Sequence, residues 1–375
     1  MDRPEPGRGE ALIRVESTTI CGSDLKILRG EYPATTYPHI PGHEWSGEVV
    51  ELGEGVNRLE VGDTVAAEPH VGCGECPRCM EGLYNLCEHY GETDHGHAHI
   101  GFTTDGGLAE YVAVDTRALH VIPENMDYDQ GAFCETAGVA LHAIERAGIS
   151  GGDDVVVIGP GAIGLAAVQI ARHQGADNVI LTGTRDERLE PAREMGPDHL
   201  INIHEVDDVV EHVTDLLGGG PDLVVELAGS EAASAQAVEM ARRGGSVVLA
   251  GSTSPGRKLN VDLREIVVGH KNIYGSVANP KWICREGFDM IARDQIDVDP
   301  LITHRFALSE FEDAIEAFRE REGARSASCC IQDAIRTKSN ERPSNGNSGA
   351  RRTDAGQFLT PATDDSNVPP TLQRC

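Results

Sequence analysis

Lysine is scarce in this 375-residue sequence, in which 32 lysines and arginines stand against 61 aspartates and glutamates. The only lysines are Lys26, Lys258, Lys271, Lys281 and Lys338. The formal net charge of −29 argues against a surface that binds nucleic acid or anionic membranes. Two interpretations stay open. One is an ordinary, very soluble protein. The other, which the shortage of lysine favours, is adaptation to high salt, because screening removes the self-repulsion of an acidic fold.

Long apolar runs are also missing. No window approaches the roughly 18 consecutive apolar residues of a membrane helix, and the opening MDRPEPGRGE has no signal-peptide core. The sequence therefore predicts a cytoplasmic protein with no membrane partner. Its ten cysteines should then stay reduced, which favours metal binding over disulfides wherever cysteines cluster.

The sequence pattern changes along the chain and predicts an α/β protein. Up to about residue 125, short apolar runs such as ALIRV and SGEVVEL are broken by Gly, Pro and Asp, which is typical of β-structure. From about residue 131, continuous apolar strands such as DDVVVIG and DLVVELAG alternate with helical segments, which predicts a parallel sheet. Helices return after residue 276, around one strand in DPLITHRFAL. Residues 334–375 lack periodicity and are predicted to be a disordered tail.

A tight cluster of cysteines predicts a structural zinc site. Cys73, Cys76, Cys79 and Cys87 follow C-x2-C-x2-C-x7-C spacing, and such turns present sulfurs to one tetrahedral zinc ion. An iron–sulfur cluster is the alternative, but the C-x3-C-P continuation of ferredoxin motifs is absent. With four thiolates bound, this zinc has no open position for catalysis.

A glycine-rich turn predicts a dinucleotide site. In VVVIGPGAIG a strand leads through Gly159, Gly161, Ile163 and Gly164 into a helix, the G-x-G-x-x-G pattern that brings pyrophosphate to a helix N-terminus. At the end of the next strand Gly183 stands where an acid normally binds the ribose of NAD.

The same segment predicts which nicotinamide cofactor binds. Without an acid at Gly183, a 2′-phosphate meets no repulsion, and Arg185 can pair with it, with Arg188 near the adenine or ribose. The sequence thus predicts a preference for NADP. NAD stays the alternative, because Asp186 would reach the ribose if the loop were shifted.

Candidate catalytic ligands lie outside the cysteine cluster. Cys21, the pair His43 and Glu44, and Glu135 supply the thiolate, imidazole and carboxylate donors that a catalytic zinc needs. His95, His97 and His99 alternate in ETDHGHAH and are a weaker candidate for another metal site.

Taken together, ICGSD, PGHEWSG, the four-cysteine lobe and GPGAIG resemble the zinc-dependent medium-chain dehydrogenase/reductase family. Glu135 and the CGSD motif resemble its sorbitol and threonine dehydrogenase branch. The resemblance implies a GroES-like β-barrel catalytic domain (1–130, zinc lobe about 70–90), a Rossmann domain (131–276) and a return to the first domain (277–333), with the active site in the cleft between them. The family usually has two further strands before this chain's first residues.

The resemblance also implies roles for individual residues. Cys21, His43 and a glutamate, Glu44 or Glu135, would bind the catalytic zinc, Ser23 would take the alcohol proton, and Asp24 would orient His43. Lys26 stands where the family usually carries a proton-relay histidine. Two zinc ions per chain and a homodimer or homotetramer are expected.

The predicted function is oxidation of a secondary alcohol of a small-molecule polyol, sugar or hydroxy amino acid, with hydride transfer to NAD(P). One alternative is a sugar 1-dehydrogenase of the glucose dehydrogenase type, which GSVANPKW faintly resembles. The other is a non-catalytic relative that only binds zinc and nucleotide.

Overall fold

Two large sheets organise the described residues, 2–251, 255–320 and 328–332, of this computed structural model. The first sheet has the order β14-β15-β1-β2-β3-β7, and β6 also pairs with β1. Its strands are β1 (Glu10–Thr19), β2 (Trp45–Leu52), β3 (Thr64–Ala67), β6 (Tyr111–Asp115), β7 (Leu119–Val121), β14 (Ile302–Ala307) and β15 (Ser328–Gln332). Strands from residue 302 onward thus join the sheet of the N-terminal segment.

Alternation along these strands builds their core. In β1, Ala11, Ile13 and Val15 point to one side, where they pack with Trp45 and other apolar side chains of the sheet. Two short strands, β4 (His70–Val71) and β5 (Ala98–His99), pair beside it.

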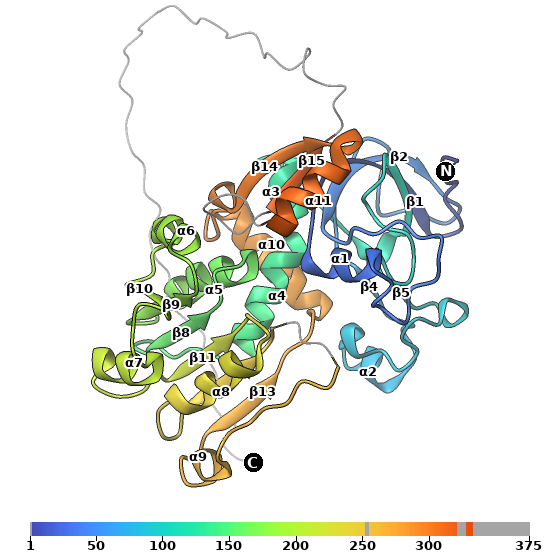
Figure 1. Ribbon diagram of the computed structural model, residues 1–375. Coiled ribbons are helices and arrows are strands. Elements are labelled where there is room, and N and C mark those ends of the chain that lie inside the picture. The colour runs from blue at the N-terminus through green and yellow to red at the C-terminus, as the bar shows by residue number, and fades with distance from the viewer. Residues whose placement is uncertain (1, 252–254, 321–327, 333–375) are drawn as a thin grey trace, which may run out of the picture. The chain divides into compact units, whose positions relative to one another are not determined.

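The second sheet is entirely parallel and has the order β10-β9-β8-β11-β12-β13. Numbered along the chain this is 3-2-1-4-5-6, the doubly wound order of dinucleotide-binding domains (Figure 1). Its strands are β8 (Val155–Ile158), β9 (Val179–Gly183), β10 (His199–Asn202), β11 (Leu223–Glu226), β12 (Ser246–Leu249) and β13 (Asn272–Gly275). The predicted α/β class with a parallel nucleotide-type sheet is confirmed.

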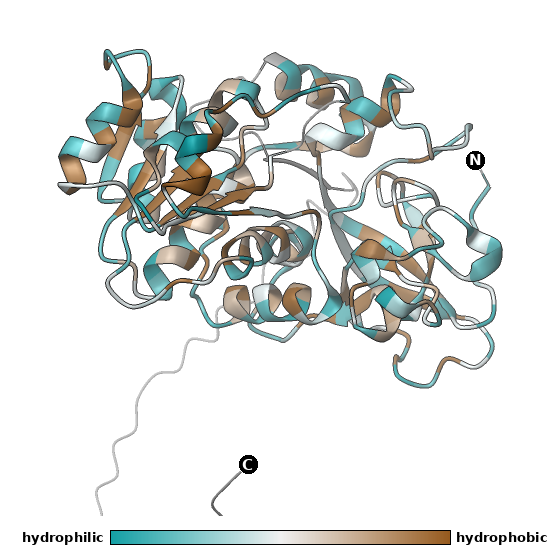
Figure 2. Ribbon diagram, turned by 90° about the horizontal axis from the view of Figure 1, so that it is seen from below, coloured by the Kyte–Doolittle hydropathy of each residue, from teal (hydrophilic) through white to brown (hydrophobic). Residues whose placement is uncertain are grey.

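Helices cover both faces of this sheet. Val155 and Val157 pack with α4 (Cys134–Glu145), α5 (Ala162–His173) and α10 (Lys281–Ala292), while Val156 packs with α7 (Val209–Leu217) and α8 (Glu231–Met240). Because both faces are buried, the strands read as continuous apolar runs, and Figure 2 shows the hydrophobic colouring concentrated in them.

The remaining helices are short or lie near the chain's return. The α-helices are α1 (Gly22–Leu28), α2 (Pro77–Met80), α3 (Tyr128–Ala132), α6 (Asp186–Leu189), α9 (Leu263–Val267) and α11 (Phe311–Glu320). Short 3-10 helices span Tyr84–Leu86, Thr93–His95, Thr116–Ala118, Glu190–Met195, Asp299–Leu301 and Leu308–Glu310. Among the described residues, no helix combines the length and apolarity that crossing a membrane requires.

The predicted domain boundaries stay a prediction, and the described residues belong to one compact unit. The tail predicted at 334–375 lies outside the described residues.

Candidate active site and metal centres

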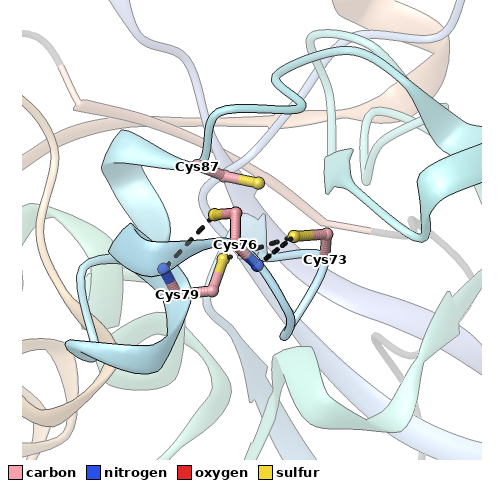
Figure 3. A group of neighbouring side chains, drawn as sticks. All are labelled: Cys73, Cys76, Cys79 and Cys87. Carbon is pink, nitrogen blue, oxygen red and sulfur yellow. Dashed lines mark hydrogen bonds between the residues drawn. The ribbon is translucent and has the colours of Figure 1, made fainter.

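The four lobe cysteines converge, as their spacing predicted. Their sulfurs all lie within 4.8 Å of one another, with Cys73 Sγ 3.8 Å from Cys79 Sγ (Figure 3). Backbone amides point at the sulfurs: the N–H groups of Cys76 and Cys79 donate to Cys73 and Cys76, each at 3.4 Å. Such donors, above all the amides of Glu88 and Cys79, lower the pKa of Cys76 to about 6. Four converging sulfurs with N–H groups that stabilise thiolate fit a zinc ion.

A second donor group joins two distant segments. Cys21 immediately precedes α1, and His43 and Glu44 immediately precede β2. One donor atom from each of these three residues lies within 4.8 Å of the others. His43 and Glu44 are buried, and His43 Nε2 lies 3.9 Å from Glu44 Oε1. Thiol, imidazole and carboxylate meet here in the combination expected of a catalytic zinc site.

Asp24 holds this group in place. Its fully buried carboxylate accepts the backbone N–H of Cys21 at 2.8 Å and that of Gly42 at 3.1 Å. Its Oδ1 also lies 3.5 Å from His43 Nδ1. Burial alone would lower the pKa of His43, but the Asp24 charge raises it well above its usual value. One carboxylate therefore fixes both ligand-bearing loops and the histidine ring.

The two glutamates lie next to each other. Thr19 and Thr136 donate hydroxyl hydrogen bonds to the Glu44 carboxylate, the latter at 3.0 Å. Glu135, buried in the first turn of α4, contacts Glu44; burial chiefly, together with the Glu44 charge, raises the pKa of Glu135 to about 8. Glu135 lies outside the 4.8 Å group of Cys21, His43 and Glu44, but its contact with Glu44 places a second carboxyl at the edge of a donor set that fits a bound cation.

The sequence analysis did not predict that Thr19 and Thr136 contact Glu44. Because Thr136 directly follows Glu135, its position near the candidate ligands could have been predicted from the sequence. No sequence pattern indicated Thr19, which lies at the end of β1, because only the pairing of β1 with β2 brings it to Glu44.

Ser23 and Lys26 both lie in α1. Ser23 Oγ is buried and has no hydrogen-bond partner among the described residues, so it is available to a ligand. Lys26 is half-buried in the last turn of the helix.

The glycine turn has the geometry that its pattern predicted. Gly159 follows β8 with φ of +112°, a backbone conformation that favours glycine, and α5 begins directly after Gly161. A Cβ at Gly164 would lie 2.0 Å from the Gly159 carbonyl oxygen, so only glycine allows this close turn. Ile163 lies in the first turn of α5.

Close packing at the end of β9 accounts for the glycine at position 183, where an acid is usual. A Cβ at Gly183 would lie 2.9 Å from Pro160 Cγ, so a longer side chain requires the turn to shift. Arg185 is exposed just before α6, and Arg188 lies in that helix. Asp186 Oδ1 accepts a hydrogen bond from Asn202 Nδ2 at 2.9 Å, which directs this carboxylate toward β10.

The three alternating histidines do not meet at one point. His95 is exposed and stacks on His89 at a ring distance of 4.3 Å, whereas His97 and His99 are buried. The described part of the chain groups His95 with His89 and Glu75 as possible ligands, not with His97 or His99. The alternation in sequence does not come from one strand, because His95 ends the 3-10 helix Thr93–His95 and only His99 lies in β5.

Known proteins match nearly the whole described chain. Two family models match, the alcohol dehydrogenase GroES-like domain over residues 7–124 and zinc-binding dehydrogenase over residues 162–293. Sorbitol dehydrogenase of Halalkalibacterium halodurans is 35% identical over 324 residues, 85% of this chain and 91% of that protein. L-threonine 3-dehydrogenase of Pyrococcus horikoshii is 34% identical over 329 residues, with 85% and 90% covered. A solved zinc-binding dehydrogenase from Sinorhizobium meliloti 1021, bound to NADP, has a TM-score of 0.81 at 34% identity and covers 88% of this chain and 94% of its own.

Proposed function

The chain belongs to the zinc-dependent medium-chain dehydrogenase/reductase family, and we propose that it oxidises a secondary alcohol of a polyol or hydroxy amino acid with NADP. The observation that carries the proposal is the convergence of Cys21, His43 and Glu44 within 4.8 Å, with Asp24 fixing the loops that bear them.

These residues would hold the catalytic zinc, with Glu135 beside Glu44 as the alternative carboxylate. When bound, zinc supplies Lewis acidity that lowers the pKa of an alcohol hydroxyl, and oxidised nicotinamide supplies the hydride acceptor. Asp24 keeps the His43 ring oriented through Nδ1, and Thr19 and Thr136 keep the Glu44 carboxylate in place.

The buried Oγ of Ser23, one residue before Asp24, would accept the proton of the substrate hydroxyl while it releases its own hydroxyl proton to the next group of the relay. Lys26, three residues along α1, passes this proton outward in place of the usual histidine. A pH–rate profile of Lys26→Ala that equals the wild-type profile would contradict this relay.

The substrate class follows from the relatives, whose names specify sorbitol and L-threonine. Both molecules carry a secondary hydroxyl group next to a second polar group. We propose a substrate of the same kind, and turnover of an aldose in preference to sorbitol and threonine would favour the sugar 1-dehydrogenase alternative.

NADP is proposed as the preferred cofactor because Gly183 leaves no carboxylate at the end of β9, and Asp186 bonds Asn202. Arg185 is exposed at the adjoining turn, where it can pair with a 2′-phosphate. The Sinorhizobium relative was solved with NADP bound. In Arg185→Ala we expect KM for NADP to rise about tenfold, the loss of one such ion pair, with KM for NAD unchanged. Better kcat/KM with NAD in the wild type would overturn the preference.

For this function we propose two zinc ions, one in the lobe and one at Cys21, on the geometry of both groups. The cytoplasmic location, the homodimer or homotetramer and the salt-adapted origin stay predictions.

Turnover of an alcohol panel tests the function. The wild type should reduce NADP with sorbitol, related polyols or threonine, and a chelator should abolish this activity. Cys21→Ser should lose at least about a hundredfold in kcat/KM, because it removes one of the zinc donors. The matched control is His173→Gln, which removes a metal-binding type of side chain at an exposed position outside every donor group of the described residues. Wild-type protein with zinc bound but no turnover of any polyol, sugar or hydroxy amino acid would favour the non-catalytic alternative.

A further inference from the structure

A third group of metal-binding side chains lies outside both sites described above. His120, Cys134 and Cys284 each place a donor atom within 4.8 Å of the others. All three are buried, with exposed fractions of 5%, 0% and 0%. No sequence motif joins them, because Cys134 and Cys284 are 150 residues apart.

Close helix packing brings the two cysteines together. Cys134 is the first residue of α4, and Cys284 lies in the first turn of α10. The helices approach so closely that a Cβ on Gly138 would lie 2.9 Å from Cys284 Cα, and one on Gly287 would lie 2.8 Å from Ala137. The two sulfurs are 3.6 Å apart as a result.

This sulfur separation matches that of a metal site. Two thiolates at Zn–S distances of about 2.3 Å and a tetrahedral angle lie about 3.8 Å apart. The lobe provides an internal comparison, since Cys73 and Cys79 Sγ are 3.8 Å apart there. A disulfide, by contrast, needs sulfurs about 2.0 Å apart.

A buried carboxylate adjoins the group. Glu68 directly follows β3, whose pairing places Ala66 opposite His120 in β7, so Glu68 is a diagonal neighbour of this histidine. Its exposed fraction is 0%, and its Oε2 lies 3.1 Å from His120 Nε2. Oε1 is buried with no hydrogen-bond partner among the described residues. In the structure this contact is a hydrogen bond, and its length is close to the roughly 3.3 Å between a nitrogen and an oxygen that both bind one zinc at about 2.0–2.1 Å.

We propose that His120, Cys134 and Cys284 form a third zinc site that pins α4 and α10 to the first sheet. Glu68 adjoins His120 but lies outside their 4.8 Å group, and its unpartnered Oε1 would close the site as the fourth donor. The charges balance: a zinc ion, two thiolates and the Glu68 carboxylate sum to −1, and the Lys281 ammonium, which interacts with Glu68 and Cys284, neutralises the remainder. Four donors leave no open position, so the site is structural.

The site is separate from the catalytic one although Cys134 adjoins Glu135. Successive residues of a helix point about 100° apart, so Cys134 meets α10 while Glu135 meets Glu44. The proposal therefore does not depend on the proposed activity.

Zinc stoichiometry tests the proposal. Native mass spectrometry of protein produced with ample zinc should find about three zinc ions per folded wild-type chain. Cys284→Ser should lose one of them, and Cys21→Ser should lose a different one, so the double variant loses two. Glu68→Gln keeps the side-chain shape and should release one zinc to a chelator faster than the wild type does.

Three results would overturn the proposal, and the first needs no variant to fold. A wild-type chain with no more than two zinc ions refutes the site, whatever its activity. A Cys284→Ser variant that keeps the wild-type count does the same. So does an intact mass that shows Cys134 and Cys284 joined as a disulfide in the native protein. An inactive chain that nevertheless carries the zinc removed by Cys284→Ser would count against the proposed function alone.

Discussion

At the scale of single residues, Asp24 has the most consequential contacts of the active-site group. It accepts two backbone N–H groups and faces His43, so its negative charge stabilises loops and ring together. Asp24→Asn keeps the shape and one acceptor oxygen but removes that charge. We expect zinc affinity at Cys21 to fall by about 10- to 100-fold and kcat/KM to fall with it.

Competition with a chelator measures the zinc affinity, and initial rates give kcat/KM. Asp63→Asn is the matched control, because this carboxylate caps a turn by accepting the Glu60 N–H at 2.8 Å far from the ligands in sequence. If both variants kept wild-type zinc affinity, the charge of Asp24 would not contribute to zinc binding and its role would be limited to holding the loops in place.

Burial of His70 predicts a dependence of stability on pH. This ring is 5% exposed, and neither nitrogen has a hydrogen-bond partner among the described residues. Burial first, then His97 and His43, lowers the pKa of His70 to about 3, against about 6.5 in an unfolded chain. The folded pKa is depressed, so this stability is complete above about pH 6.5 and is lost as the pH falls toward 3, because only the unfolded chain binds the proton.

The expected loss is about 1.4 kcal/mol of unfolding free energy per pH unit below about pH 6. Urea unfolding at a series of pH values measures it, and His70→Gln should remove that part of the slope. His212→Gln, at an exposed histidine, should leave the slope unchanged. Equal slopes for His70→Gln and wild type would contradict the prediction.

At the scale of elements, the contact between α4 and α10 depends on glycine. A methyl group at Gly138 meets Cys284 Cα at 2.9 Å, which backbone cannot relieve without separating the helices. Gly138→Ala should therefore destabilise the protein by about 1–3 kcal/mol. The melting temperature should drop by several degrees in calorimetry. Gly151→Ala, where the added carbon finds open space, should leave it nearly unchanged, and equal melting temperatures of the two variants would refute the packing argument.

The same contact shows why sequence reasoning reached some elements and not others. The four lobe cysteines and the glycine turn are local in sequence, so spacing and a strand–helix context were enough to predict them. Cys284 carried no pattern, since only the packing of α10 on α4 brings it to Cys134. Glu68 and His120 likewise depend on the register of β3 and β7. Residue type predicted the donors, but long-range packing decided which of them meet.

At the scale of the whole molecule, charge dominates. With a net charge of −29, the negative side chains repel one another in dilute buffer. Salt weakens this repulsion, because the Debye length shrinks from about 10 Å at 0.1 M to about 3 Å at 1 M salt. Many of the described carboxylates already pair with arginine, as Glu48 does with Arg14 at 2.6 Å, but acids outnumber bases nearly two to one. Screening by salt should reduce the repulsion among the carboxylates that have no basic partner.

We therefore expect the urea midpoint to rise between about 0.1 M and 2 M potassium chloride, because screening lowers the repulsion of the folded state more than that of the expanded chain. Salt also strengthens apolar burial, so a charge variant must separate the two causes.

Replacing the exposed Glu205, Asp207 and Glu239 by amides should raise the midpoint in dilute buffer and flatten its rise with salt. Replacing the exposed Arg29, Arg193 and Arg264 by glutamine should lower the midpoint and steepen the rise. If all three proteins gained equally from salt, apolar burial and not charge would govern the response, and adaptation to high salt would lose its physical basis.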